Sequence, residues 1–212
     1  MISLSAPLKE PVILLANGEF PVHHLSKYLL DNSETIICTD GATDKLIKYG
    51  LEPTVTIGDL DSTKLSEHES PGLWVPAQDQ NKTDLQKALD WCIINNIIEI
   101  TILGAGGIRE DHALGNLHIL AEYQGMVELK MVTNHATINC EQGNRIISSQ
   151  PGQAISIIAI HPVESITVSG LKYPMVNQRL LPSSRAICNE ALNHEFSLDT
   201  SDPVWLFMNH TD

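Results

Sequence analysis

Two aspartates, Asp59 and Asp61, follow directly after a short apolar run and Gly58. In extended or turning backbone, side chains at positions i and i+2 point the same way. Two carboxylates that face one spot repel each other unless a cation lies between them or one takes up a proton. Mg²⁺ suits such ligands, because it binds through one or two carboxylates together with substrate phosphates. The pair therefore indicates a magnesium site that serves a phosphorylated ligand.

Three more polar clusters follow predicted strands. Asp40 lies in the stretch 39–42, and Asp84 ends the polar stretch 78–84. Each could also be an ordinary helix cap or a first-turn carboxylate that favours the helix dipole. In the functional interpretation, Asp84 faces Asp59 and Asp61 as a third metal ligand. Ligands in open α/β sheets bind outside the carboxyl ends of strands, so the shared location of the clusters favours a single site.

The last of these clusters, 104–112, is rich in glycine, which lets backbone N–H groups approach phosphate. It is neither a Walker A loop nor a clean GxGxxG motif, because Arg109 stands where the third glycine would fall. Arg109 can instead bind phosphate oxygens through two parallel hydrogen bonds. In the stretch before Asp84, Lys82 or Thr83 could also contact phosphate.

The elements that must position these residues alternate in the first two-thirds of the chain. Hydrophobic patterning predicts strands at 12–16, 34–39, 54–57, 73–75 and 97–103. Helices are predicted at 21–30, 42–49, 83–95 and 111–123, the last with Leu114, Leu117, Leu120 and Ala121 inward. Alternation of this kind predicts an α/β domain with a doubly wound, mostly parallel sheet.

The pattern changes near Asn134. Short β-like runs follow at 136–140, 145–149, 154–160, 165–169, 185–189, 194–197 and 204–208, separated by turn residues. Regular short strands favour an all-β sandwich or barrel. We therefore expect two domains, 1–134 and 135–212.

Composition excludes several classes of function. The 212 residues carry a net charge of −13, which argues against general nucleic-acid binding and against an anionic membrane surface. The four cysteines form no CxxC pair, a usage that favours a reducing, cytoplasmic location. Neither a signal peptide nor a membrane-spanning apolar run is recognisable.

Taken together, the motifs resemble those of the thiamine pyrophosphokinases. The matching stretches occur in family order, between residues 17 and 190, at 40–42, 58–62, 80–84, 104–112, 170–174 and 189–190. Two positions differ from the usual family pattern. Cys188 stands where serine is common, and Ile108 stands where glycine is frequent.

The resemblance implies a Mg²⁺-dependent enzyme that transfers pyrophosphate from ATP to the hydroxyl of thiamine, giving thiamine diphosphate and AMP. It implies an α/β catalytic domain and a β-sandwich thiamine-binding domain in a homodimer with active sites at the interface. The implied metal and catalytic carboxylates are Asp59, Asp61 and Asp84, with Asp40 as a further catalytic residue. The implied ATP-binding residues are Gln80, Asn81, Lys82, Thr83, Arg109, Asp111 and His112. Cys188 and Asn189 are implied to contact thiamine.

Several alternatives stay open at this point. The same fold and metal site could serve another acceptor, such as a hydroxymethylpterin, or a non-catalytic nucleotide- or thiamine-binding regulator. A purely structural domain would have to place four polar clusters at strand ends by chance. The sequence does not decide whether Asp59 or Asp84 accepts the hydroxyl proton.

Overall fold

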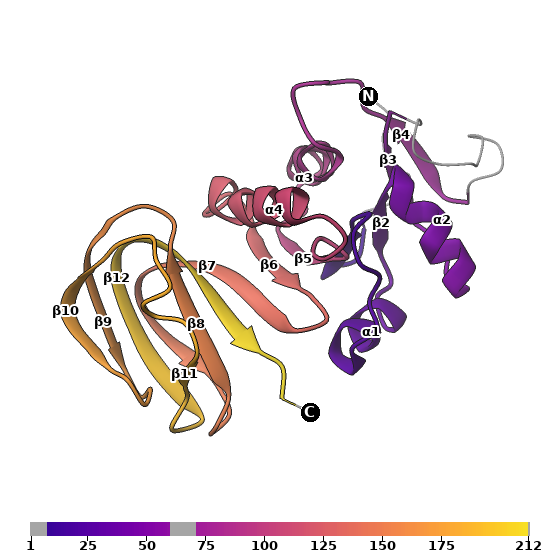
Figure 1. The fold of residues 1–212 in the computed structure, drawn as a ribbon. Helices are drawn as coiled ribbons and strands as arrows, with labels where there is room; N and C mark the ends of the chain where they lie inside the picture. The colour runs from indigo at the N-terminus through magenta and orange to yellow at the C-terminus, as the bar shows by residue number, and fades with distance from the viewer. Residues whose placement is uncertain (1–7, 60–70, 212) are drawn as a thin grey trace. The chain divides into compact units, whose positions relative to one another are not determined.

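The computed structural model describes residues 8–59 and 71–211 (Figure 1). It contains two compact units, one that ends at Asn134 and one that begins at His135. The predicted metal ligand Asp61 lies outside the described residues. Within the described residues, no helix is long and apolar enough to cross a membrane.

The first unit is built on a parallel sheet with strand order β6-β5-β1-β2-β3-β4. Its strands are β1 (Val12–Leu15), β2 (Ile36–Thr39), β3 (Val55–Gly58), β4 (Leu73–Pro76), β5 (Glu99–Leu103) and β6 (Glu128–Val132). Its helices are α1 (His24–Asp31), α2 (Asp40–Tyr49), α3 (Asp84–Ile94) and α4 (Glu110–Glu122). The expected α/β architecture with a mostly parallel sheet is confirmed.

The strand order reverses between β1 and β5, because β1 pairs with β2 on one side and with β5 on the other. A reversal of this kind opens a crevice at the carboxyl ends of the two strands. Helices α1 and α2 cover one face of the sheet, and α3 and α4 lie on the other (Figure 1). The connections after β1, β2, β3 and β5 therefore reach the same edge.

Helix α3 shows how local sequence sets an element of the site. The Thr83 hydroxyl accepts a hydrogen bond from the Gln86 N–H at 3.3 Å, and the Gln86 side chain accepts one from the Thr83 N–H at 3.1 Å. This capping box satisfies two of the donors that every helix start leaves free. Leu85, Ala88 and Leu89 are buried on one face, as predicted.

Helix α4 differs from its prediction. Its buried apolar residues are Ile119 and Leu120, whereas Leu114 is 54% exposed. The prediction that Leu114 faces inward was therefore wrong. Near it, the N-terminal half of α4 contributes Gly115 and Asn116 to the wall of a cavity instead of packing an apolar stripe on the sheet.

Over the described residues 135–211, the strand pairs of the second unit are antiparallel. Its strands are β7 (Ala136–Ser148), β8 (Ala154–Ala159), β9 (Val163–Ser169), β10 (Met175–Leu180), β11 (Asn189–Glu190) and β12 (Glu195–Asn209). Their inward side chains form one core that includes Ile155, Ile166, Leu198 and Leu206. The expected all-β character of this part is confirmed.

Several strand boundaries in the second unit were wrong. The two runs predicted at 136–140 and 145–149 form one strand, in which Gly143 has a φ of 75° and pairs with Thr200. The runs at 194–197 and 204–208 also form one strand, whose register shifts between Thr200 and Val204. Glycine and a β-bulge can bend a long strand without ending it. The predicted boundaries were wrong because residues typical of turns were taken as strand ends.

Other strands were missed or absent. Strands β6 and β10 were not predicted, and of the run at 185–189 only Asn189 belongs to a strand. Cys188 has a φ of 55°, which is outside the strand region. A strand therefore cannot continue from residue 185 through Cys188 to Asn189.

Glycines let the ends of β1 and β5 meet. The Gly18 N–H donates to the Gly104 carbonyl at 2.6 Å, and the Glu19 N–H donates to the Gly106 carbonyl at 2.8 Å. A Cβ atom on Gly18 would lie 2.4 Å from the Gly104 oxygen and 2.6 Å from the Gly106 oxygen. Both are backbone atoms, so relief would require the strand ends to separate.

We expect Gly18→Ala to lower the free energy of unfolding by about 1–3 kcal/mol, the usual cost of overpacking. Circular dichroism at 222 nm during thermal unfolding measures this, since every helix of the described residues is in the first unit. Gly115→Ala is the control, because its added Cβ meets nothing within 4 Å. In the α4 interior that change should stabilise by about 0.5–1 kcal/mol. Equal effects of the two variants would contradict this account.

Candidate functional site

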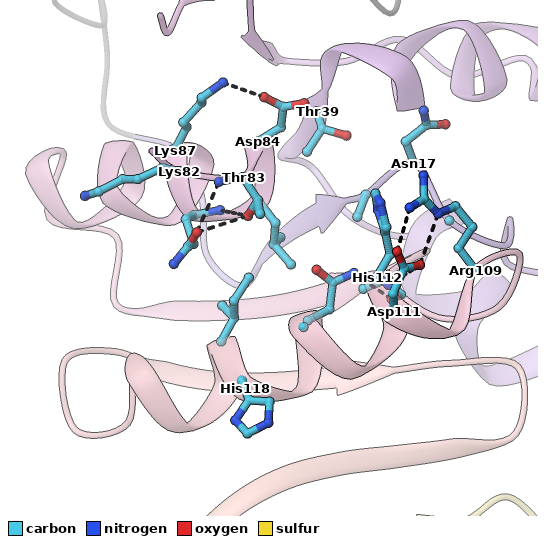
Figure 2. A pocket seen from close by; sticks show the side chains of 18 of the residues that line it. Asn17, Thr39, Lys82, Thr83, Asp84, Lys87, Arg109, Asp111, His112 and His118 are labelled. Carbon is cyan, nitrogen blue, oxygen red and sulfur yellow. Dashed lines mark hydrogen bonds and ion pairs between the residues drawn. The ribbon is translucent and has the colours of Figure 1, made fainter. Parts of the chain in front are cut away.

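A cavity of about 870 Å³ lies in the first unit. Its wall includes Asn17 and Gly18 after β1, Thr39 at the end of β2, and residues from the loops before α3 and α4 (Figure 2). Among the predicted site residues, it is lined by Asp59, Gln80, Lys82, Thr83, Asp84, Arg109, Asp111 and His112. The four strand-end clusters thus contribute to one region, as their shared location predicted.

Asp40 does not line the cavity, but its side chain packs against Gly58 at the end of β3. It is 1% exposed, and its Oδ1 atom accepts a hydrogen bond from the Gly41 N–H at 2.6 Å. A Cβ atom on Gly58 would lie 2.6–2.8 Å from the Asp40 side chain. Gly58 therefore provides the space for a buried carboxylate next to the backbone of Asp59.

Lys87 is a site residue that sequence reasoning missed. Its side chain is 6% exposed, and its Nζ atom lies 2.9 Å from Asp84 Oδ1 and 3.8 Å from Asp59 Oδ2. Figure 2 shows the contact with Asp84 at the start of α3. The sequence held one signal, since Lys87 follows Asp84 by three residues in a helix and must share its face. It was overlooked because a lysine in a helix is usually exposed.

The charge of Lys87 is set by opposing influences. Burial disfavours the ammonium form, but the hydrogen bond and charge of Asp84, with the charges of Asp59 and Asp40, outweigh it and raise the pKa above 10.5. Lys87 is therefore a permanent cation at neutral pH. It offsets the mutual repulsion of carboxylates that converge on this part of the cavity.

The donors match magnesium chemistry. Carboxylate oxygens are hard ligands, and Mg²⁺ needs only one or two of them when substrate phosphates complete its shell. Asp59 and Asp84 supply two carboxylates joined through Lys87. Residues 8–59 and 71–211 contain no group of three or more His, Cys, Asp or Glu side chains able to hold a metal. Asp61, the other predicted ligand, is not among them.

The loop before α4 presents an exposed ion pair. Arg109 donates through Nε to Asp111 Oδ1 at 3.1 Å and through Nη2 to Asp111 Oδ2 at 2.6 Å (Figure 2). The hydrogen bonds from Arg109 lower the pKa of the Asp111 carboxyl to about 2. The Asn116 side chain ties α4 to the loop by donating to the Ala105 carbonyl at 2.8 Å.

In the loop before α3, three of the predicted ATP-binding residues contact acidic side chains. Gln80 donates to Asp59 Oδ2 at 3.3 Å, which links this loop to the carboxylates. Asn81 does not line the cavity, because its backbone and side-chain N–H groups both donate to Asp79 Oδ1. Lys82 lines the cavity while its Nζ atom contacts Asp90 of α3.

The two predicted thiamine residues lie in the second unit. Cys188 is exposed, and its N–H donates to the Ser156 hydroxyl at 3.0 Å. The Asn189 side chain is 7% exposed; it accepts from the Tyr173 N–H at 3.0 Å and donates to the Tyr173 carbonyl at 2.8 Å. Asn189 thus fixes the turn at 170–174, which carried part of the family resemblance.

An open parallel α/β sheet with a glycine-lined, carboxylate-bearing cavity at its strand ends defines a nucleotide-phosphate-binding class of protein. Comparison with family models makes the assignment specific. Residues 26–132 match the thiamin pyrophosphokinase catalytic domain, and residues 135–205 match the thiamin pyrophosphokinase vitamin B1 binding domain. The chain belongs to the thiamin pyrophosphokinase family.

Individual proteins agree with this assignment. The thiamine pyrophosphokinase of Bacillus subtilis is 28% identical over an alignment of 188 residues, and the alignment covers 83% of this chain and 87% of that protein. A crystal structure of the Bacillus subtilis thiamine pyrophosphokinase aligns with a TM-score of 0.78 and 26% identity, covering 95% of this chain and 99% of that one. Yeast thiamin pyrophosphokinase shares the fold, with a TM-score of 0.78 at 17% identity over 93% of this chain and 85% of that one.

We expect Lys87→Met to lower the free energy of unfolding at pH 7 by about 1–3 kcal/mol, because Asp84 and Asp59 lose their cation. Activity should fall by about 10- to 100-fold, as when a residue that holds metal ligands is lost. The pKa of Lys87 is raised in the folded state above its ordinary value of 10.5. The stabilisation that Lys87 contributes is therefore fully present below pH 10.5, and it is lost as the pH rises through the higher, folded-state pKa.

Thermal unfolding of the wild type and Lys87→Met at pH 7 and pH 9 checks this, with Lys87→Arg as the variant that keeps the charge. The difference between wild type and Lys87→Met should be the same at the two pH values. A difference that vanishes by pH 9 would show that the charge of Lys87 is not the cause.

Ile108 carries backbone strain. It has a φ of 62°, a left-handed conformation that is unfavourable for a β-branched residue, and it is 72% exposed. We expect Ile108→Gly to raise the free energy of unfolding by about 1 kcal/mol, because strain is relieved and little packing is lost. Ile108→Val keeps the β-branch and should leave stability unchanged in the same urea titration. If Ile108→Gly destabilised the protein, the strain argument would be wrong.

Proposed function

We propose that this protein binds ATP and Mg²⁺ in the cavity of the first unit and transfers the pyrophosphoryl group to the hydroxyl of thiamine. The observation that supports this most is that acidic metal ligands and a glycine-rich, arginine-bearing loop line the same cavity. Carboxylates alone would repel a nucleotide, and backbone N–H groups alone would bind any anion. Together they suit a metal–nucleotide complex.

The reaction requires one displacement. The thiamine hydroxyl oxygen attacks the β-phosphorus of ATP, a bond from this oxygen to phosphorus forms, and the bond from phosphorus to the oxygen bridging the α-phosphate breaks. The electron pair leaves on AMP, and the hydroxyl proton passes to Asp59 or Asp84. Such chemistry needs mainly positioning and charge neutralisation.

Each part of the cavity has a role in this proposal. Mg²⁺, held by Asp59, Asp61 and Asp84, would neutralise charge on the phosphates. Arg109 lies in the glycine loop and binds phosphate oxygens when its pairing with Asp111 opens to the nucleotide. Lys87 orients Asp59 and Asp84 by contacting both carboxylates, which is a positioning role.

The remaining proposed ATP contacts lie around the wall of the same cavity. Gln80, Lys82, Thr83 and His112 line the cavity and are proposed to contact the nucleotide. Asn81 is proposed to shape the loop through Asp79. Asp40 is proposed to add negative charge at the base of the metal site.

We further propose that the division of labour follows the chain, with ATP and magnesium bound by 1–134 and thiamine by 135–212. The match of 135–205 to a vitamin B1 binding domain supports this. Cys188 and Asn189 are proposed to lie at the thiamine site, where a thiol replaces the usual hydroxyl and makes a weaker hydrogen bond. The active form is proposed to be a cytoplasmic homodimer with sites at its interface, and the four free cysteines suit that compartment.

We expect Asp59→Asn and Asp84→Asn each to lower turnover by about 100-fold or more, because each removes a charge that organises the metal. Incubation with Mg-ATP and thiamine, followed by chromatography of nucleotides and thiamine esters, measures this. Asp31→Asn is the control, since Asp31 is exposed on α1 and does not line the cavity.

Wild-type protein should form thiamine diphosphate and AMP in equal amounts. Release of ADP would contradict pyrophosphoryl transfer, and turnover of a hydroxymethylpterin without turnover of thiamine would identify a different acceptor. Ligand binding without any turnover would point to a regulator.

A further inference from the structure

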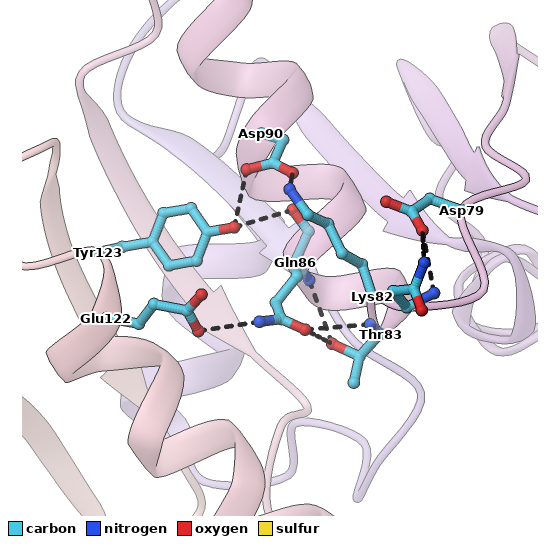
Figure 3. A network of polar contacts seen from close by, with 8 residues as sticks. Asp79, Lys82, Thr83, Gln86, Asp90, Glu122 and Tyr123 are labelled. Carbon is cyan, nitrogen blue, oxygen red and sulfur yellow. Dashed lines mark hydrogen bonds and ion pairs between the residues drawn. The ribbon is translucent and has the colours of Figure 1, made fainter.

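A polar network connects the C-terminal end of α4 to the loop before α3 (Figure 3). In its first branch, the Tyr123 hydroxyl donates to Asp90 Oδ1 at 2.8 Å. The other oxygen of Asp90 accepts from Lys82 Nζ at 2.5 Å. One carboxylate therefore joins Tyr123, which follows the last residue of α4, to a lysine of the cavity wall.

The second branch runs parallel to the first. Gln86 donates through Nε2 to Glu122 Oε2 at 2.8 Å. The Oε1 atom of the same side chain accepts from the Thr83 N–H at 3.1 Å. The two branches thus begin at Glu122, the last residue of α4, and at Tyr123, which follows it. They end at the adjacent residues Lys82 and Thr83, which both line the cavity.

The anchor of the first branch is rigid. Tyr123 is 4% exposed, and a buried phenol requires a hydrogen-bond partner. Burial raises its pKa, and its hydrogen bond to Asp90 raises it further, so the hydroxyl keeps its proton at neutral pH. Asp90 is held from one side by this donor and is restricted to few orientations when it meets Lys82.

A fixed lysine binds an anion at lower cost than a mobile one. A free lysine side chain loses rotamer freedom when it binds, and a side chain already held in place has less to lose. The side chain of Lys82 is 42% exposed, so solvent alone would leave it mobile. The Asp90 contact restricts the ammonium group beside the cavity.

We propose that Asp90 and Tyr123 are positioning residues that hold Lys82 for the phosphates of the nucleotide. Neither residue lines the cavity, so their effect passes through Lys82. The inference rests on the proposed function, specifically on a contact between Lys82 and ATP. It adds two residues that do not line the cavity to those that would affect nucleotide binding.

The same chemistry elsewhere in the unit offers a matched control. The Tyr49 hydroxyl of α2 donates to Asp31 Oδ1 of α1 at 2.9 Å. That pair also joins two helices through a tyrosine and an aspartate, but neither residue lines the cavity and Asp31 makes no contact with Lys82. Removing this hydrogen bond measures the kinetic effect of losing a link between two helices that does not involve Lys82.

The test is steady-state kinetics of Asp90→Asn, Tyr123→Phe, Asp31→Asn and Tyr49→Phe, with ATP and thiamine varied separately. We expect Asp90→Asn and Tyr123→Phe to raise the KM for ATP by about two- to tenfold, the range of one or two hydrogen bonds. Their kcat and their KM for thiamine should stay within about twofold of wild type. The control pair should leave all three constants unchanged.

A double-mutant cycle with Lys82→Met tests whether Asp90 affects ATP binding through Lys82. If Asp90 acts through Lys82, Asp90→Asn should add nothing to the KM for ATP once Lys82 is methionine. An equal effect of Asp90→Asn in both backgrounds would overturn the positioning role. So would a lower KM for ATP in Asp90→Asn, because Asp90 would then be competing with phosphate for Lys82.

Other outcomes bear on the proposed function instead. If Lys82→Met leaves the KM for ATP unchanged, the proposed contact between Lys82 and ATP fails and the inference fails with it. If Lys82→Met raises the KM while Asp90→Asn and Tyr123→Phe do not, the nucleotide site stands and only the inference is overturned. Asp90→Glu, which keeps the charge, should recover part of the lost affinity.

Discussion

The site depends on a lysine that is buried among carboxylates. Carboxylates that share one small region repel each other unless a cation lies between them. Lys87 supplies the positive charge in the free protein. Lys87 therefore orients Asp59 and Asp84 in the free protein, through contacts of 3.8 and 2.9 Å.

Features with a local cause could be predicted from the sequence. The capping box of Thr83 and Gln86 fixes the start of α3 within four residues of chain, and the apolar alternation identified the parallel strands. The meeting of Asp59 with Asp84 followed from a general property of parallel sheets, whose strand ends share one edge. These inferences needed no knowledge of how the helices pack.

Features that depend on tertiary approach could not be predicted. Lys87 is buried only because α3 lies against the ends of β2 and β3, and the outward orientation of Leu114 follows from the position of α4 beside the cavity. In the second unit, Gly143 looked like a turn because its local signal is the same in a turn and in a bent strand. Pairing with Thr200 decides between the two.

Helix α4 has Arg109 before its first turn and Tyr123 after its last. Its thirteen residues span about 20 Å as a stiff rod. A tilt that moved the arginine would therefore also move the tyrosine that holds Asp90. Directed evolution of nucleotide preference would be constrained by this coupling between the two ends of the helix. Changes that reshape one end of the cavity would need compensating changes at the other end, some 20 Å away along the helix.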